Sequence, residues 1–297
     1  MPEQVTIQVL DPGALTTVQD QGRPGHAHLG VPRSGALDQP ALRLANRLVG
    51  NPEEAAGLET TLTGVRFRAD HGCRLAVTGA DCTVLVDQRA VAWGAAVSVG
   101  AGAVVEVGTA RSGLRSYVAF AGGVALEPVL GSRSTDLLSL LGPAPLQAGQ
   151  RVPLGPSRGD AVSVEAVRRT VAPVLHLHLG PHAERFTSPA IAALDGASYV
   201  VGAASNRIGL RLVGVPVERR EHAELATEAM VLGAVQVPPN GQPVVFLHDH
   251  PTTGGYPVVG VVREVDLPVC AQARPGDRIT FRVLGGAVGG PGRPPRS

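Results

Sequence analysis

The chain of 297 residues contains no lysine, because all 26 of its basic residues are arginine. It therefore has no Walker A phosphate loop, which needs a Gly-Lys-Ser/Thr sequence, and no Schiff-base nucleophile, which needs a lysine amine. Covalent biotin is excluded on this chain as well, since biotin is carried on a lysine. Chemistry with ATP or biotin thus requires another phosphate-binding group or another chain. A GC-rich genome that favours arginine codons would explain the missing lysines and leaves these exclusions unchanged.

Cysteine, net charge and long apolar runs are also scarce. The three cysteines are odd in number and lack CxxC spacing, so we expect neither a disulfide framework nor a zinc site. A formal charge of +1 gives no field that would attract nucleic acid or an anionic membrane. The start of the sequence lacks the pattern of a signal peptide, and no apolar run reaches the roughly 18 residues of a membrane span. These features predict a reduced, cytoplasmic protein that binds no nucleic acid, membrane or metal.

Aromatic residues make up only 3% of the chain, so the core must be built mainly from Val, Leu and Ala. Gly (38) and Pro (25) are frequent, which is typical of many short strands joined by turns. The only good helical pattern is Gln39–Val49, with Leu42, Ala45, Asn46 and Val49 on one face. We therefore predict a mainly β protein with few short helices. The strand-like stretches are 73–79, 82–87, 96–100, 103–108, 114–123, 173–180, 198–203 and 277–284.

The polar, turn-rich stretch 155–165 suggests a domain boundary. We predict an N-terminal β unit over 1–160, with a glycine-rich site loop and one helix, and a C-terminal β unit over 161–284. Residues 285–297 have too little apolar surface to offset the entropy of ordering, which predicts a disordered tail.

The run Asp249–Pro257, with the sequence DHPTTGGYP, is the first candidate site. It follows the apolar run PVVFL and precedes the strand-like VVGVV, so it lies at a strand end. A hairpin needs only two to five turn residues, whereas this loop carries an acid, an imidazole, several hydroxyls and two glycines. Asp249 either performs proton chemistry or caps the turn. His250 is either a proton shuttle or a solvated imidazole.

A second candidate is the polar opening segment Thr17–Asp38, in which arginine, histidine, serine and aspartate alternate with glycine. A segment this polar between apolar elements is typical of a structured site loop; the alternative is a surface Ω-loop. Histidines 176, 178 and 182 raise the alternative of a metal site, which we do not favour because no carboxylate pair accompanies them.

Seven blocks in order carry a resemblance to a known family: TVQDQGRPGHAHLGVPRSGALD, ANRLVGN, YVAFAGGV with GSRST, SNRIGLRLVG, GAVQVPPNGQP, TTGGYP and RPGDRITF. Together they resemble the KipA / PxpC family, also described as biotin-dependent carboxyltransferase-like or allophanate hydrolase subunit 2-like. The match runs from about Val5 to Val283. The resemblance implies a cyclophilin-like β-barrel architecture with two related β units. It also implies a KipI/PxpB-like partner, with the site in the cleft between the two chains.

Three functions are linked to this family. The one we favour is the PxpC-type subunit of an ATP-dependent 5-oxoprolinase, an amide-cleaving hydrolase that converts 5-oxoproline to glutamate with a PxpA-like subunit. The alternatives are a KipA-like regulator that binds a KipI-like kinase inhibitor, and the carboxyltransferase of a urea carboxylase-like enzyme. We expect ATP, with Mg²⁺, to bind only in the complex, and the chain alone to be inactive.

The expected site follows from these blocks. Asp249 and Glu228 are the candidates for the proton steps. Arginines hold phosphate or carboxylate together with the backbone of the TTGG turn, since lysine is absent. The expected binding residues are Arg23, Ser34, Asn206, Arg207, Thr252, Thr253, Gly254, Gly255 and Tyr256. Pro251 stands where the family often has Gln, and Leu210 where a Tyr is frequent, which predicts a different substrate contact.

Overall fold

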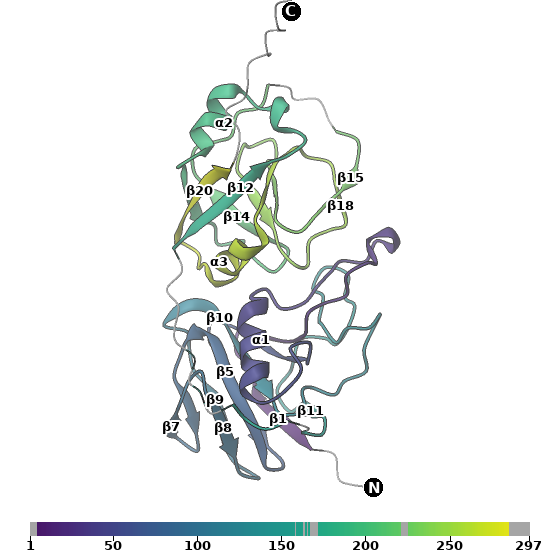
Figure 1. The fold of residues 1–297 in the computed structure, drawn as a ribbon, viewed down its shortest axis with the longest axis vertical. Helices are drawn as coiled ribbons and strands as arrows, with labels where there is room; N and C mark the ends of the chain where they lie inside the picture. The colour runs from purple at the N-terminus through teal and green to yellow at the C-terminus, as the bar shows by residue number, and fades with distance from the viewer. Residues whose placement is uncertain are drawn as a thin grey trace, which may run out of the picture.

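Two β units lie one above the other along the long axis of the molecule, with the C-terminal unit at the top in Figure 1. This computed structural model describes residues 5–157, 159–162, 164, 166, 172–220 and 225–284. The predicted mainly β class is confirmed. The predicted boundary at 160/161 falls between the last strand of one unit and the first of the next, and it stays a prediction. The tail 285–297 lies outside the described residues.

The N-terminal unit consists of two antiparallel sheets. The first has the strand order β11-β1-β4-β9-β6-β7 and the second β2-β3-β10-β5-β8. The strands of the first sheet are β1 (Thr6–Asp11), β4 (Val65–Ala69), β6 (Val84–Val86), β7 (Arg89–Val91), β9 (Val104–Val107) and β11 (Arg151–Pro153). Those of the second are β2 (Leu15–Gln19), β3 (Gly57–Thr61), β5 (Cys73–Asp81), β8 (Ala96–Val99) and β10 (Ser112–Phe120).

Apolar side chains from both sheets form the core of this unit. Strand β4 alternates strictly: Val65, Phe67 and Ala69 are buried, and the arginines between them are exposed. The rings of Phe67 and Phe120 meet edge to face across the two sheets, with centroids 5.4 Å apart. With so few aromatic residues in the chain, valine and leucine fill most of the remaining volume, as the composition predicted.

Helix α1 (Gln39–Leu48) covers the outer face of the second sheet, and Figure 1 shows it at the edge that faces the upper unit. It begins where the Asp38 carboxylate accepts the backbone N–H of Ala41 at 3.1 Å, with Pro40 in the first turn. Its apolar face packs on Ala76 of β5 and Ala119 of β10. These strands are buried on both faces, which is why their sequences show little polar alternation. The predicted helix is confirmed to within one residue.

The C-terminal unit is a closed barrel of seven strands in the order β12-β19-β16-β17-β14-β13-β20. All pairs are antiparallel except β12 with β20, which closes the barrel in parallel. The strands are β12 (Val174–Leu179), β13 (Ser198–Val201), β14 (Gly209–Val213), β16 (Ala234–Gln236), β17 (Val244–Phe246), β19 (Val258–Val262) and β20 (Arg278–Leu284). The barrel that the resemblance implied is confirmed. All eight strand-like stretches of the sequence contain strands.

Short helices and one ribbon surround the barrel. The helices are α2 (Ser188–Leu194), α3 (Leu267–Gln272) and the 3-10 turns η2 (Ala183–Arg185) and η3 (Glu264–Asp266); η1 (Ala27–Leu29) lies in the opening segment. A two-stranded ribbon, β15 (Glu228–Ala229) with β18 (Thr253–Gly254), stands outside the barrel. Among the described residues, no helix has the length and apolar character that crossing a bilayer requires.

Helix α3 joins the two units. The Gln272 side-chain oxygen accepts the backbone N–H groups of Leu114 and Arg115 at 2.9 and 3.0 Å, and its nitrogen donates to Asp38 at 2.8 Å. The Arg115 guanidinium donates to the carbonyl of Ala271 at 2.5 Å. The barrel is therefore attached to β10 and to the start of α1 by directional bonds. These bonds fix the relative position of the opening segment and the DHPTTGGYP loop.

Candidate functional site

The opening segment is a rigid, internally bonded loop. The Asp20 carboxylate accepts the N–H of Gly22 at 2.8 Å, the hydroxyls of Ser132 and Ser134 at 2.6 Å each, and the N–H of Arg133 at 2.6 Å. Asp20 thereby attaches the GSRST block to the opening segment, more than a hundred residues away in the chain. Because these bonds fix the loop, the interpretation of a structured site loop is supported.

A second cluster lies directly beside it. Arg23 donates to the Ser34 hydroxyl at 2.8 Å and to the carbonyls of Ser134 and Val129 at 2.5 and 3.3 Å. The Ser34 hydroxyl donates in turn to Asp136 at 2.6 Å. Both Arg23 and Ser34 are buried. Their expected roles in ligand binding stay predictions, although each already has protein partners that a ligand would have to displace.

The backbone at Gly22 passes very close to the backbone at Arg33 and Ser34, and this contact requires glycine. Gly22 has a φ of +85°, and a Cβ placed on it would lie 2.5 Å from the carbonyl oxygen of Ser34. Any other residue at this position would push the two stretches of backbone apart. Gly22 thus brings Arg23 next to the turn that carries Arg33 and Ser34.

Arg207 is the centre of a buried ion cluster between the two units. Its Nε and Nη2 bond both oxygens of Asp249 at 2.9 Å each, Nη2 also donates to the carbonyl of Gly35 at 2.7 Å, and Nη1 bonds Glu59 of β3. The side chains of Arg207 and Asp249 are 1% and 0% exposed. Burial alone would lower the pKa of Arg207, but Asp249 and Glu59 outweigh it and raise that pKa. Arg207 therefore stays charged.

Glu59 receives the rest of the cluster. Its second oxygen accepts the Tyr117 hydroxyl at 2.8 Å and the Leu37 N–H at 2.9 Å, and Arg115 lies 3.6 Å from the first oxygen. Burial acts to raise the pKa of Glu59, but Arg207, Arg115 and these hydrogen bonds together lower it. A carboxylate with so many donors stays ionised and holds the two units together.

The expectation that Asp249 handles a proton stays a prediction, but its geometry points to structure. Both carboxylate oxygens are held by Arg207, and one of them also accepts the N–H of Leu137 at 3.2 Å. The side chain is fully buried and does not line the cavity described next. Asp249 orders the loop from beneath, and the residues that follow it reach the surface of the cavity.

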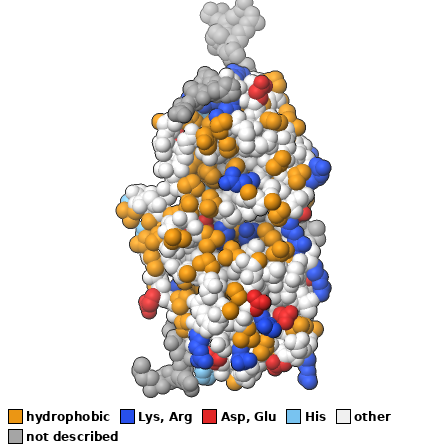
Figure 2. Space-filling model, turned by 180° about the vertical axis from the view of Figure 1, so that it is seen from behind, with side chains coloured by type: hydrophobic (Ala, Val, Ile, Leu, Met, Phe, Trp, Pro, Cys, Tyr) orange, Lys and Arg blue, Asp and Glu red, His pale blue; other side chains and the backbone are white. Residues whose placement is uncertain are grey.

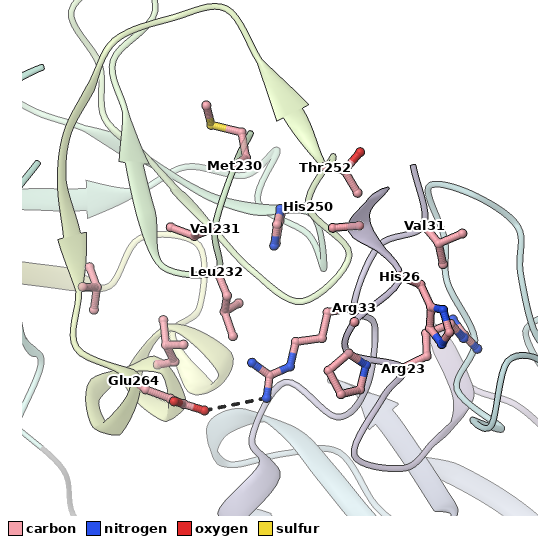
Figure 3. A pocket seen from close by; sticks show the side chains of 15 residues that line it. Arg23, His26, Val31, Arg33, Met230, Val231, Leu232, His250, Thr252 and Glu264 are labelled. Atoms are coloured by element: carbon pink, nitrogen blue, oxygen red, sulfur yellow. Dashed lines mark ion pairs between the residues drawn. The ribbon is translucent and has the colours of Figure 1, made fainter. Parts of the chain in front are cut away.

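A cavity of about 350 Å³ lies between the opening segment and the barrel. Figure 3 shows side chains reaching it from both units, and Figure 2 shows basic side chains at the mid-height of the molecule, where the units meet. One wall is cationic and comes from the opening segment, and the other is largely apolar and comes from the barrel. The lining includes Arg23, His26, Val31, Arg33, Met230, Val231, Leu232, His250, Thr252, Glu264 and Leu267.

His250 is the imidazole on the barrel wall of this cavity. The alternative of a solvated imidazole is wrong, because His250 is only 6% exposed and stacks on Phe246 with ring centroids 5.9 Å apart. Its Nδ1 lies 2.7 Å from the carbonyl oxygen of Pro251, which can only accept, so Nδ1 carries the hydrogen. Burial lowers the pKa of His250, and the charge of Arg33 adds to that shift. The ring is therefore neutral, and Nε2 has a lone pair that can accept a proton.

Arg33 is the second cationic group on the cavity wall. Its Nη2 lies 3.9 Å from the Glu264 carboxylate of η3, across the boundary between the units (Figure 3). Its Nε is buried and has no hydrogen-bond partner among the described residues. Taken together, the cavity combines an available guanidinium, a neutral imidazole and an apolar wall. This combination suits a small anion with an apolar ring or chain.

Comparison with known proteins places this arrangement in a family. The profile described as "Carboxyltransferase domain, subdomain A and B" matches residues 29–283. The chain belongs to this carboxyltransferase-domain family. The resemblance seen in the sequence blocks is thereby confirmed.

Relatives in this family have different names. The chain is 37% identical to a 5-oxoprolinase subunit of Escherichia coli, over 93% of this chain and 90% of that one. It is 30% identical to the urea amidolyase of Saccharomyces cerevisiae, over 95% of this chain but only 17% of that protein. The overall size of the chain therefore matches that of the E. coli protein, and it corresponds to only one part of the amidolyase.

Solved structures show the same fold. The crystal structure of TTHA0988 matches with a TM-score of 0.86 at 35% identity, over 95% of this chain and 56% of that one. The Kluyveromyces lactis urea carboxylase matches with a TM-score of 0.88 at 28% identity, over 96% of this chain and 28% of that one. The chain thus spans about half of TTHA0988 and about a quarter of the carboxylase.

Glu228, the second predicted carboxylate, lies on the ribbon outside the barrel and is not part of the cavity lining. Its carboxylate pairs with His182 Nε2 at 3.2 Å, and His182 Nδ1 accepts the N–H of Val258 at 3.3 Å. Because Nδ1 accepts, Nε2 must carry the hydrogen that faces Glu228. A proton role for Glu228 stays a prediction; the observed contact fastens β15 to the barrel.

The other predicted residues have different surroundings, and one of them lines the cavity. Asn206 caps the turn after it by accepting the N–H groups of Ile208 and Gly209 at 2.9 and 3.2 Å. Thr252 lines the cavity. Tyr256 is exposed, and the Arg219 guanidinium lies 5.9 Å from the centroid of its ring. The remaining predicted residues, Thr253, Gly254 and Gly255, form or follow the short strand β18.

Two of the histidines weighed as metal ligands have separate structural roles. His176 Nδ1 pairs with Asp266 at 2.9 Å, and His182 pairs with Glu228. Within the described part of the chain, no group of three His, Cys, Asp or Glu side chains could hold a metal ion. Each of these two histidines instead joins a loop to the barrel.

Sequence analysis did not single out Arg33, Glu264 or Glu59. Arg33 stood in the quoted opening block, but nothing in the sequence separates it from Arg23 ten residues earlier. Glu264 and Glu59 lie outside every block. A signal for Glu59 existed: it is a carboxylate in the middle of the strand GLETT, and a buried charge needs a partner.

Proposed function

We propose that the chain is the PxpC-type subunit of an ATP-dependent 5-oxoprolinase, in which 5-oxoproline, ATP and water give glutamate, ADP and phosphate. The observation that carries the proposal is the 37% identity to the E. coli 5-oxoprolinase subunit over 90% of its length. The absence of lysine agrees with it, because a chain that shares its site with partner chains needs no phosphate-binding lysine of its own.

The cavity supports a small acid as substrate. Its volume of about 350 Å³ is near the lower end of ligand pockets. The five-membered ring of 5-oxoproline would lie on the apolar wall, and its carboxylate would face the cationic one. Arg23 and Arg207 already have several protein partners each, so ATP and its Mg²⁺ would be held largely by the partner chains.

The lactam of 5-oxoproline is stabilised by resonance, so its hydrolysis must be driven. Transfer of the terminal phosphoryl group of ATP to the carbonyl oxygen releases ADP and makes the carbon a better electrophile. Water then adds, and the C–N bond breaks as the nitrogen takes up a proton, which leaves an acyl phosphate. A second water hydrolyses this acyl phosphate to the glutamate carboxylate and free phosphate. In this chain the neutral His250 is positioned to accept the proton from water, since its Nε2 has an available lone pair. The predicted alternatives for this role, Asp249 and Glu228, do not line the cavity.

The complex would contain a KipI/PxpB-like and a PxpA-like subunit. Purified together, the three chains should release ADP and glutamate only when 5-oxoproline is present. The chain alone should not hydrolyse ATP. ATP turnover that does not respond to 5-oxoproline would exclude this function.

The family match favours one second candidate, carboxyl transfer from biotin, since the urea amidolyase and urea carboxylase share this domain. That reaction requires a biotinylated partner, which streptavidin blotting of the purified complex would detect. A purely regulatory, KipA-like role needs only the partner interface. In that case His250→Gln would leave partner binding and every measured function intact.

A further inference from the structure

The guanidinium of Arg33 is poorly bonded by the residues that the structure describes. Its Nε is buried and has no hydrogen-bond partner among the residues described. Its one ion pair within the described residues, from Nη2 to Glu264, spans 3.9 Å. Charge-assisted hydrogen bonds of this kind are normally about 2.7–2.9 Å long, so the Glu264 contact is electrostatic only.

Two other arginines in the same region have very different surroundings. Arg23 donates to a hydroxyl and two carbonyls, and Arg207 to two carboxylates and a carbonyl. Buried polar groups are nearly always bonded, and each exception needs an explanation. Arg33 is the exception among these three, and Figure 3 shows its side chain extending from the opening segment toward Glu264 on the other side of the cavity.

The surroundings favour an ion pair that Arg33 makes inside the cavity over one that it makes at the exposed rim. Val231, Leu232 and Leu267 line the same cavity, and His250 on the opposite wall is kept neutral by burial. A guanidinium–carboxylate pair that forms against these apolar side chains is less screened than one at an open surface. The planar fork of arginine binds both oxygens of a carboxylate, which a compact ammonium group cannot do.

Glu264 can be displaced easily. Its side chain is 71% exposed, whereas that of Arg33 is 34% exposed. Surface ion pairs of this kind are weak, because water and salt screen them. A ligand carboxylate that reaches Arg33 from the cavity can therefore replace Glu264 with little loss of affinity.

We propose that Arg33 is the specificity residue of the cavity: it binds the carboxylate of a small organic acid in two-point fashion, in exchange for Glu264. The identification of that acid as 5-oxoproline rests on the proposed function; the anchoring of a carboxylate does not. Pocket shape then selects the ring or chain, and Arg33 selects the charge.

The test is direct binding to the full chain, alone and with its KipI/PxpB-like partner, measured by calorimetry. The probes are 5-oxoproline, 2-pyrrolidinone (the same ring without the carboxylate) and urea. The variants are Arg33→Gln, Arg33→Lys and Glu264→Gln. The control is Arg282→Gln, because Arg282 makes an ion pair with Asp195 of the same length, 3.9 Å, on an exposed part of the barrel.

We expect Arg33→Gln to weaken 5-oxoproline binding about tenfold to a hundredfold, as loss of bonds to a charged group does. Arg33→Lys should retain only part of the wild-type affinity for 5-oxoproline, and Arg282→Gln should leave that affinity unchanged. Glu264→Gln should strengthen binding about two- to fivefold, because the competing carboxylate is gone. 2-Pyrrolidinone should bind wild type and Arg33→Gln equally, and urea binding should likewise be independent of Arg33.

Three results would overturn the proposal: equal loss of 5-oxoproline and 2-pyrrolidinone binding, an Arg33→Gln effect no larger than that of Arg282→Gln, or no carboxylate binding by either preparation up to about 10 mM. Arg33-dependent binding of 5-oxoproline in a complex that never forms glutamate would refute the 5-oxoprolinase function and leave the carboxylate anchor intact. Glutamate formation that Arg33→Gln leaves unchanged would refute the carboxylate anchor and leave the 5-oxoprolinase function intact.

Discussion

Replacing Arg207 with methionine is the sharpest test of the ion cluster between the two units. The substitution removes the guanidinium that bonds Asp249 at 2.9 Å twice and the Gly35 carbonyl at 2.7 Å, together with its bond to Glu59. Methionine roughly fills the apolar volume of the side chain but donates no hydrogen bond. Two buried carboxylates therefore remain at the interface with fewer donors.

The expected cost follows from their burial. Removing one partner of a buried ion pair typically costs about 3–5 kcal/mol, because the remaining charge stays desolvated. Glu59 retains Arg115, Tyr117 and Leu37, so most of the penalty comes from Asp249, which among the described residues keeps the N–H of Leu137. We expect a loss near the middle of that range, about 4 kcal/mol, against a total stability of about 5–15 kcal/mol.

Urea unfolding followed by circular dichroism measures this loss, as a midpoint lower by about 1 M or more. Arg47→Met is the matched control, since it removes an exposed ion pair with Glu53 and should cost less than about 1 kcal/mol. The double variant Arg207→Met/Asp249→Leu should regain part of the stability, because it also removes the stranded carboxylate. If Arg207→Met costs no more than Arg47→Met, the cluster does not hold the units together.

Three further predictions concern the same region. Asp249→Asn should lower the midpoint of urea unfolding. Any loss of turnover in the assembled complex should disappear when turnover is compared per folded molecule. A variant that is stable but inactive would instead support Asp249 as a proton-handling residue. Burial lowers the pKa of His248 and His250 below 6.5, so the unfolded chain binds more protons as the pH falls through that value. The free energy of unfolding should therefore fall by up to about 1.4 kcal/mol per pH unit for each histidine, and a stability profile that is flat between about pH 7 and about pH 5.5 would contradict this. Gln272→Ala should cost about 1–3 kcal/mol, since it leaves two N–H groups of β10 unpaired; a change within error by urea unfolding would show that α3 is not a fixed joint.

The fold was predictable because its signals are local. The β-branched runs and the apolar spacing of Gln39–Val49 each act within a few residues, and each matches an observed element. No local sequence signal indicates that β20 pairs with β12 and closes the barrel. That pairing joins Val174 to Thr280, more than a hundred residues apart, and only the resemblance to a family indicated a barrel.

The site was predictable only in part, for a related reason. Two of the segments that line the cavity, the opening loop and the DHPTTGGYP loop, were identified by their unusual polarity, whereas the segments 230–232 and 262–267 were not. The roles within the two loops were not, because Asp249 and His250 are adjacent in the sequence and have opposite environments. Asp249 points into the ion cluster with 0% exposure, and His250 lines the cavity. His248 and Asp249 form a turn after β17, closed by the N–H of His250 on the carbonyl of Leu247 at 3.0 Å, and the chain changes direction between the two side chains.

What separates a binding arginine from a structural one is whether the protein already supplies its hydrogen-bond partners, and those partners are distant in the sequence. Arg207 bonds Glu59 across 148 residues and Arg23 bonds Ser134 across 111. Both of these arginines are well bonded, whereas Arg33, which stands in the same block as Arg23, has an unpaired Nε within the described residues. A protein without lysine must use arginine both to hold its units together and to bind anions. Only the folded structure shows which arginine does which, because a satisfied guanidinium stabilises the fold and an unsatisfied one on a cavity wall remains available for a ligand.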